Sequence, residues 1–143
     1  MRRAYQKIEQ ESKADLTLFP DVVIDFFSGI EPIASTVAEL IQLNRLALTS
    51  ITLFELYAGI TGKRRVGQID DLVSFIPVLP LEKRDAETAA KIYNELKQKG
   101  TLIGNQDILI AGICINHERP LITRNTEHFS RISNLQLYPT GIG

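Results

Sequence analysis

Polar side chains recur in this sequence at the ends of short apolar segments. They form four groups, which are Asp21 with Asp25, the segment at residues 50–55, Asp107, and the triplet at residues 123–125. Hard divalent cations such as Mg²⁺ take oxygen ligands, and a metal of this kind activates water for phosphodiester cleavage. Carboxylates that are crowded together repel one another unless a cation neutralises them. An acidic cluster of this composition therefore predicts a metal site.

Each of these side chains also has a purely structural explanation. Glu55 stands three residues after Thr52, which fits a capping box at the start of a helix. Asp107 lies in the first turn of its predicted helix, where a carboxylate meets the helix dipole favourably. Asn125 fits the N-cap position of the following helix, and Asp25 fits the start of a short helix or turn. Only the joint placement of these residues at strand ends indicates a functional site.

The elements that must position these residues alternate between short apolar strands and helices. The first apolar segment is interrupted by Pro20. This alternation predicts a parallel sheet with helices on both faces, and ligands of such sheets bind beyond the carboxyl ends of the strands. The predicted strands lie at residues 16–24, 46–51, 76–81, 121–123 and 135–138. The predicted helices lie at residues 33–43, 52–60, 66–75, 85–100 and 107–117, with a short one at residues 126–132.

The length and composition fit one soluble globular domain. The chain has 143 residues, of which 44% are hydrophobic and 23% are charged. Residues 1–15 form a polar N-terminal arm, and residues 16–143 are predicted to form the folded domain. The formal net charge is −1, so no overall basic field favours a nucleic-acid ligand. A local basic patch can nevertheless coexist with an acidic metal site.

The single cysteine, Cys114, excludes an internal disulfide and a cysteine-rich zinc site. No apolar run approaches the roughly 20 residues that span a bilayer, and the arm lacks the apolar centre of a signal peptide. These features predict a cytoplasmic protein without a membrane partner.

Other catalytic motifs are not supported. Residues 59–64 lack the spacing and the hydroxyl residue of a phosphate-binding loop. His117 and His128 do not have metal-ligand spacing, and no serine lies in a nucleophile elbow. A phosphate-accepting domain of the response-regulator type would need an aspartate after the third strand and a lysine after the fifth. The sequence supplies neither.

Four segments of the chain, in order and from about Asp21 to the C-terminus, resemble the successive blocks of VapC-type PIN-domain toxins. The resemblance implies a three-layer α/β/α sandwich on a five-stranded, mainly parallel sheet. It further implies an endoribonuclease that depends on Mg²⁺ or Mn²⁺, inhibition by a VapB-type antitoxin, and a homodimer. The segments are VVIDFFSG at residues 22–29, LTSITLFELYAG at residues 48–59, IGNQDILIA at residues 103–111, and LITRNTEHF at residues 121–129.

The resemblance also implies roles for individual residues. Glu55 matches the second acidic ligand of the family and Asp107 the third. Asn125 falls beside the loop that positions the metal and the attacking water, so the implied catalytic residues are Glu55, Asp107 and Asn125. Asp21 lies two positions after the place of the first catalytic aspartate. The implied metal ligands in this chain are therefore Asp21, Glu55 and Asp107, and the two carboxylates Glu55 and Asp107 are expected to approach one another.

The first catalytic aspartate of the family is missing, because Phe19 followed by Pro20 occupies its place. Three explanations remain open: decay of a toxin, an altered or misassigned N-terminus, or a site that recruits Asp21 instead. The alternative function is consequently a catalytically impaired PIN-domain protein that binds antitoxin or RNA without cleaving.

Two surfaces are expected to bind macromolecules. Lys63, Arg64 and Arg65 follow the helix that carries Glu55, and with Arg124 they could contact the RNA backbone. A solvated helix start explains the basic run equally well. The helices at residues 33–43 and 66–75 carry apolar stripes that a small sheet does not fully cover. We expect an exposed apolar patch there, used by a second protomer or by an antitoxin helix.

Overall fold

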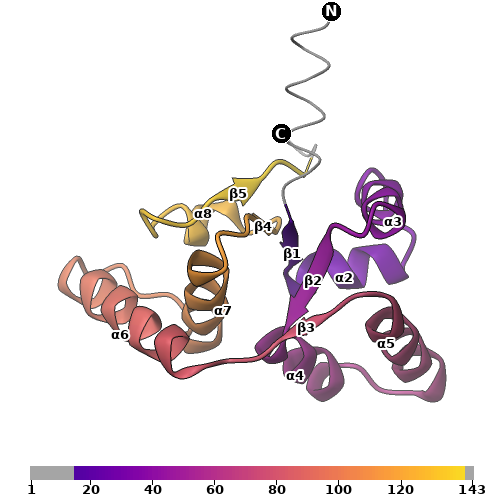
Figure 1. Ribbon diagram of the computed structural model, residues 1–143, viewed down its shortest axis with the longest axis horizontal. Coiled ribbons are helices and arrows are strands. Elements are labelled where there is room, and N and C mark those ends of the chain that lie inside the picture. The colour runs from indigo at the N-terminus through magenta and orange to yellow at the C-terminus, as the bar shows by residue number, and fades with distance from the viewer. Residues whose placement is uncertain (1–14, 141–143) are drawn as a thin grey trace, which may run out of the picture.

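A computed structural model describes residues 15–140 and shows a central sheet between two layers of helices (Figure 1). All strand pairs are parallel, and the strand order is β3-β2-β1-β4-β5. The prediction of a five-stranded parallel sheet is thus confirmed. The strands are β1 (Leu16–Leu18), β2 (Leu46–Thr49), β3 (Val78–Leu79), β4 (Leu121–Ile122) and β5 (Leu137–Tyr138).

The helices cover both faces of the sheet. Figure 1 shows α2, α3 and α5 on one side and α6 and α7 on the other, so the predicted sandwich is confirmed. In the part of the chain that the structure describes, no helix is long and apolar enough to cross a membrane. The helices are α2 (Pro20–Phe27), α3 (Ile33–Gln42), α4 (Ser50–Gly59), α5 (Lys63–Phe75), α6 (Lys83–Gln98), α7 (Asn105–Asn116) and α8 (Thr126–Phe129).

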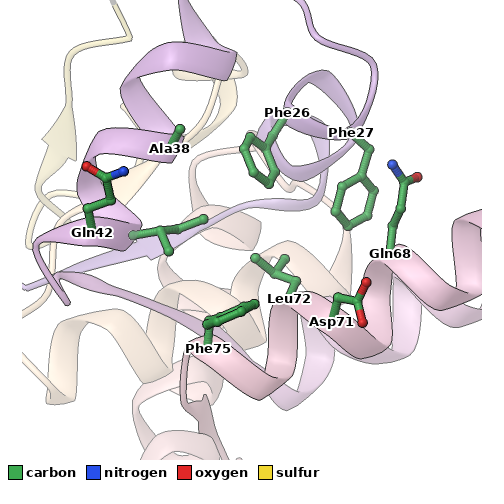
Figure 2. A pocket seen from close by; sticks show the side chains of 9 residues that line it. Phe26, Phe27, Ala38, Gln42, Gln68, Asp71, Leu72 and Phe75 are labelled. Atoms are coloured by element: carbon green, nitrogen blue, oxygen red, sulfur yellow. The ribbon is translucent and has the colours of Figure 1, made fainter.

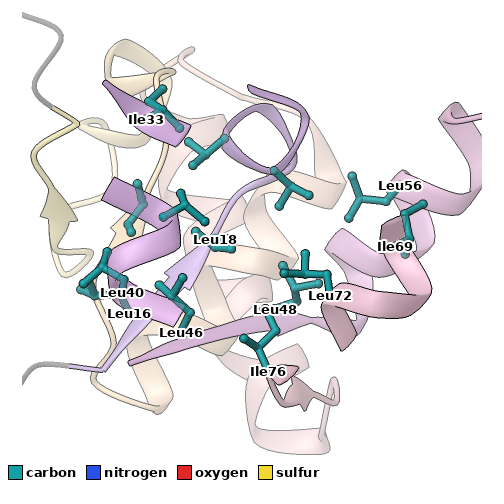
Figure 3. Packing of buried hydrophobic residues seen from close by; sticks show 14 residues of the cluster. Leu16, Leu18, Ile33, Leu40, Leu46, Leu48, Leu56, Ile69, Leu72 and Ile76 are labelled. Carbon is teal, nitrogen blue, oxygen red and sulfur yellow. The ribbon is translucent and has the colours of Figure 1, made fainter. Parts of the chain in front are cut away.

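Two apolar clusters hold the layers together, one on each face of the sheet. Leu16 and Leu18 of β1 pack in the cluster under α2, α3 and α5, which Figure 3 shows. Phe19, one residue further, belongs to the cluster under α6 and α7. This alternation follows from the period of two of an extended strand. The Cys114 thiol is fully buried, and burial raises its pKa to about 12, as expected for a core residue rather than a reactive one.

One predicted strand is wrong over half of its length. Residues 22–24 do not extend β1, because the chain leaves the sheet at Phe19 and forms α2 from Pro20. Proline is well suited to the first position of a helix, where its missing N–H removes no hydrogen bond. Asp25 therefore lies within α2, and its predicted role at the start of a helix or turn is also wrong.

The predicted capping box at Thr52 and Glu55 is wrong as well. Helix α4 begins earlier, at Ser50, and the Thr49 hydroxyl accepts the hydrogen bond from the Thr52 amide at 3.0 Å. Glu55 consequently lies in the middle of α4, where it has no capping role. Its carboxylate is therefore available for another role.

Helices α6 and α7 pack closely against one another. A side chain at Gly112 of α7 would place its Cβ 2.8 Å from the carbonyl oxygen of Asp85. The buried Asp85 carboxylate accepts a hydrogen bond from the Asn116 amide group at 2.8 Å, and the Thr88 hydroxyl donates to the same asparagine at 3.1 Å. These contacts fix the orientation of α7, which carries Asp107 at its other end.

The predicted polar arm lies outside the described residues except for Asp15. The Asp15 carboxylate is 3.5 Å from the Arg119 guanidinium and 3.9 Å from that of Arg45. The chain thus enters β1 beside two cations at the amino end of the sheet.

Candidate functional site

The strand order reverses between β1 and β4, and the loops that follow these two strands diverge there. Chain connections run outward from β1 to β2 and β3, and then cross to β4 and β5 on the other side. In open parallel sheets a crevice forms at such a reversal, beyond the carboxyl ends of the strands. Asp21 follows β1, and Thr123 follows β4, so both lie at this point of the sheet.

Asp21 is held by the loop after β4. Its Oδ2 atom accepts hydrogen bonds from the Arg124 amide at 3.0 Å and from the Thr123 hydroxyl at 3.1 Å. Its Oδ1 atom is buried and makes no hydrogen bond to any residue in the described range 15–140. Burial raises the pKa of Asp21 above its ordinary value. The hydrogen bonds from Arg124 and Thr123, the charge of Arg124 and the backbone of Val22 partly offset that rise. One oxygen is thus fixed, and the other lacks a partner within that range.

The charge of Asp107 acts on Glu55 although the two residues lie far apart in the sequence. Burial raises the pKa of Glu55, and the negative charge of Asp107 raises it further. Burial also raises the pKa of Asp107; His128 lowers it, and the charge of Asp21 raises it. Asp107 therefore interacts with both of the other acidic groups. The structure brings all three of the predicted metal ligands to the same edge of the sheet.

Asn125 occupies the N-cap position directly before α8, as predicted, but its side chain makes no capping hydrogen bond. Its Nδ2 atom lies 3.0 Å from Nδ1 of His128, and its backbone amide donates to the Thr123 hydroxyl at 3.0 Å. His128 is a site residue that sequence reasoning missed, because its spacing from His117 does not suit a pair of metal ligands. Its position three residues after Asn125, on a helix that starts at the site, was the available signal.

Arg124 forms a short ion pair at the edge of the site. Its Nε atom lies 2.7 Å from Oδ2 of Asp25, and its second contact, from a terminal nitrogen to Oδ1, is 3.4 Å. Asp25 is 5% exposed, whereas the Arg124 side chain is 47% exposed, so the carboxylate of this pair is shielded from water and the guanidinium only in part. The Arg124 guanidinium is thus engaged by a carboxylate on α2.

The other predicted RNA contacts lie elsewhere. Lys63 and Arg64 are exposed at the start of α5, and Arg65 donates to the Ser28 hydroxyl at 3.2 Å. Ser28 follows the last residue of α2, whereas Asp21 lies in its first turn. The basic run therefore adjoins the end of α2 that is remote from the acidic residues.

The acidic residues fit a divalent cation only in part. Within residues 15–140, no group of three or more His, Cys, Asp or Glu side chains is arranged so that it could hold a metal ion. Mg²⁺ usually keeps several waters and needs only one or two carboxylates together with substrate phosphates. The unpartnered Oδ1 of Asp21 and the mutual influence of Asp107 and Glu55 fit such a hydrated ion.

Phe19 lies at the position where the resemblance implies the family's first carboxylate. Its ring is 8% exposed and meets the Phe129 ring edge-on, with centroids 4.9 Å apart. It belongs to the apolar cluster on that face of the sheet, which also contains Ile108 and Ala111 of α7. This position contributes no metal ligand and instead adds to the core.

An apolar groove runs between α2, α3 and α5, and its volume is about 370 Å³ (Figure 2). Phe26 and Phe27 of α2 form one wall, and Leu72 and Phe75 of α5 form another. Phe75 is 71% exposed. The expected apolar patch on the helices at residues 33–43 and 66–75 is therefore present, with α2 as a third contributor.

Comparison with known proteins agrees with this architecture. Residues 21–135 match the family model described as the PIN domain. The chain is 34% identical over 98 residues to Ribonuclease VapC2 of Rickettsia felis, which covers 66% of this chain and 73% of that protein. It is 34% identical over 108 residues to Ribonuclease VapC1 of Haemophilus influenzae, covering 73% of this chain and 81% of the relative.

A solved structure supports the same relationship. The structure of VapBC-1 from nontypeable Haemophilus influenzae superimposes with a TM-score of 0.77 at 28% identity, covering 88% of this chain and 98% of the other. The fold, the matched domain and the identities of these relatives lead to one assignment. The chain belongs to the PIN-domain proteins, within the VapC ribonuclease toxin family of VapBC toxin–antitoxin systems.

Proposed function

We propose that this chain is a metal-dependent endoribonuclease, the toxin of a VapBC pair, with a weakened catalytic site. The observation that carries this proposal is the chain of contacts at the carboxyl edge of the sheet, in which the Asp107 charge acts on Glu55 and the Asp21 charge acts on Asp107. Relatives that are named ribonucleases support the same reaction, which is hydrolysis of phosphodiester bonds in RNA.

The residues that would hold Mg²⁺ or Mn²⁺ are Asp21, Glu55 and Asp107. When bound, such an ion lowers the pKa of a coordinated water and stabilises charge on the scissile phosphate. Asp107 interacts with both other carboxylates, so it has the central position. Asn125 holds the His128 ring beside Asp107 and thereby shapes the edge of the site.

A second candidate function is binding of antitoxin or RNA without cleavage. Phe19 favours it, because a buried phenyl ring cannot replace a metal-binding carboxylate. Catalysis depends both on metal affinity and on the geometric control of the reacting groups. We therefore expect slow cleavage, and the two functions differ in how the chain responds to a carboxylate at position 19.

The test compares the parent chain with Phe19→Asp and with Phe19→Asn, each with and without Asp107→Ala. RNA cleavage and Mn²⁺ affinity are measured for every variant. Both substitutions at position 19 remove the contact with Phe129, but only aspartate adds a charged ligand. We expect Phe19→Asp to raise the cleavage rate and the Mn²⁺ affinity by about tenfold or more. The loss of a single group that supports a metal site lowers metal affinity or activity by a similar factor.

Thermal unfolding must accompany this comparison, because removing a buried phenylalanine costs about 3–5 kcal/mol in typical cores. Cleavage that is rapid in the parent chain and lost in Asp107→Ala would show that the site needs no carboxylate at position 19. If Phe19→Asp is folded but as inactive as Phe19→Asn, the binding-only function is supported instead.

RNA contacts are proposed for Lys63, Arg64, Arg65 and Arg124. Lys63 and Arg64 are exposed on the first turn of α5, which suits phosphate binding. The Arg124 side chain is occupied by Asp25, so its contribution would come from the part of the guanidinium that remains exposed. The RNA sequence that is cut does not follow from these residues.

The proposed protein partner is a VapB-type antitoxin that inserts an apolar helix into the α2–α3–α5 groove. Phe26, Phe27 and Phe75 suit the apolar face of such a helix, and Asp71 on the rim suits a basic residue. A homodimer is also proposed, with the exposed Phe54 of α4 at the contact, since its side chain is 59% exposed. The reducing cytoplasm suits the buried thiol of Cys114 and the RNA substrate.

A further inference from the structure

Asp25 has a contact pattern that an ordinary surface ion pair lacks. Its side chain is only 7% exposed, and both of its oxygens face the Arg124 guanidinium, at 2.7 and 3.4 Å. The two residues lie 99 positions apart in the sequence. A planar guanidinium that meets a carboxylate with two nitrogens is fixed in direction as well as in position. The pair therefore fastens the loop after β4 to α2.

The same loop residue also holds Asp21. The Arg124 backbone amide donates to Oδ2 of Asp21 at 3.0 Å, while the Arg124 side chain binds Asp25. Asp21 and Asp25 lie four residues apart on α2, which is about 6 Å along one face of a helix. Arg124 thus bridges two successive turns of that face, with its main chain on one carboxylate and its side chain on the other.

This arrangement holds the Arg124 guanidinium against α2, where it is paired with Asp25, while its charge still acts on the nearby Asp21 carboxyl. Oδ1 of Asp21 is buried and has no hydrogen-bond partner in the described range. A guanidinium released from Asp25 would find the acidic groups of the site close by, and it would compete there with a divalent cation. Asp25 holds that guanidinium in place and at the same time fixes the Arg124 amide that orients Asp21.

We propose that Asp25 is a positioning residue of the acidic site, which acts through Arg124 to hold Asp21 ready for a divalent cation. This inference rests on the proposed metal-dependent function. On this view the main role of Arg124 is to hold the acidic site together, and contact with RNA is secondary. It also explains how a site without a carboxylate at position 19 keeps Asp21 in a fixed orientation.

The test uses Mn²⁺ alone, titrated into the full chain and into Asp25→Asn, which keeps the size of the side chain and removes its charge. We expect the Mn²⁺ affinity to fall by about tenfold, in line with the effect of groups that support metal ligands. The double variant Asp25→Asn with Arg124→Gln removes the released cation and is expected to recover part of the affinity. Glu95→Gln, an exposed charge removal on α6, is the matched control.

Amide hydrogen exchange at Arg124 supplies a readout that needs no metal. Exchange is expected to be faster in Asp25→Asn than in the parent chain, because the Arg124 amide loses its fixed place against Asp21. If a folded Asp25→Asn chain shows unchanged amide exchange at Arg124 and unchanged Mn²⁺ affinity, the positioning role of Asp25 is overturned, while the proposed metal site is not. A parent chain that binds no Mn²⁺ would contradict the proposed metal site, and the present inference would fall with it.

Discussion

The carboxyl groups of Glu55 and Asp107 are partly buried, and their negative charges repel one another. Burial and the Asp107 charge raise the pKa of Glu55, so the folded chain binds that proton more readily than the unfolded chain does. Ionisation of such a group lowers the stability of the fold. The unfavourable contribution is fully present above the raised pKa, and it disappears as the pH falls below the ordinary pKa of a glutamate.

Replacing Glu55 by glutamine is therefore expected to raise the free energy of unfolding at pH 7.5. The gain should be about 0.5 kcal/mol, because the side chain is partly solvated and its interactions are screened. It should shrink as the pH is lowered and vanish below the ordinary range of glutamate titration. Urea unfolding at several pH values measures this dependence.

The matched control is Glu95→Gln on the exposed side of α6, which should change the stability little at any pH. Lower stability of Glu55→Gln at pH 7.5 would contradict the interpretation that the Glu55 charge is held at a cost to the fold.

Individual site residues could be predicted only where a local rule applies to them. Glu55, Asp107 and Asn125 follow apolar segments, and the sequence therefore places them at the carboxyl edge of the sheet. The pairing of Arg124 with Asp25 joins residues 99 positions apart, and no local pattern indicates it. His128 belongs to the site through a contact with Asn125 that depends on the geometry of a four-residue helix.

At the scale of the elements, the close contact of α6 with α7 depends on Gly112. A Cβ at this position would lie 2.8 Å from the Asp85 carbonyl oxygen and 3.2 Å from the Ala89 amide nitrogen. Both atoms belong to the backbone of α6, so they cannot move without shifting the helix. We expect Gly112→Ala to lower the free energy of unfolding by about 1–3 kcal/mol, as overpacking does in other cores.

Gly67→Ala is the matched control, because Gly67 also lies inside a helix, α5, and a Cβ added there would meet no neighbouring atom within 4 Å among the described residues. There the substitution should stabilise the fold by about 0.5–1 kcal/mol through the helix propensity of alanine. Chemical denaturation of both variants makes the comparison. Equal stabilisation by the two substitutions would show that α6 and α7 are not in tight contact at Gly112.

Long helices with a clear apolar period are the most predictable elements. The sequence predicts a helix at residues 85–100, and the structure has α6 at Lys83–Gln98, because the apolar period, the charge pairs and Gly100 all agree. The strand predicted at residues 22–24 is wrong, since a short apolar run fits a buried strand and a buried helix turn equally well. Pro20 resolves this ambiguity only after its place at the first position of α2 is known.

At the scale of the whole molecule, the groove and α4 present two separate apolar surfaces. We expect Phe75→Ser to weaken binding of a VapB-type antitoxin that co-purifies with the parent chain by about tenfold or more, since exposed aromatic anchors dominate such interfaces. Binding is measured by calorimetry, and the mass of the free chain by sedimentation. Phe75→Ser should leave that mass unchanged.

Phe54→Ser is the converse variant, because Phe54 is exposed on α4 and does not line the groove. It should lower the mass of the free chain and leave antitoxin binding unchanged. Loss of antitoxin binding in Phe54→Ser, with normal binding in Phe75→Ser, would place the partner on α4 and contradict the proposed use of the groove.

Helix α2 contributes to both of the proposed binding surfaces. Its first turn supplies Asp21 to the acidic site, and its last turn supplies Phe26 and Phe27 to the groove. Thermodynamic reciprocity then applies: any factor by which an occupied groove changes the affinity for metal equals the factor by which metal changes the affinity of the groove. If the chain binds metal weakly, as we propose, the site stays largely empty at cellular metal concentrations and this coupling has little effect. Its complex with an antitoxin would then respond little to metal supply.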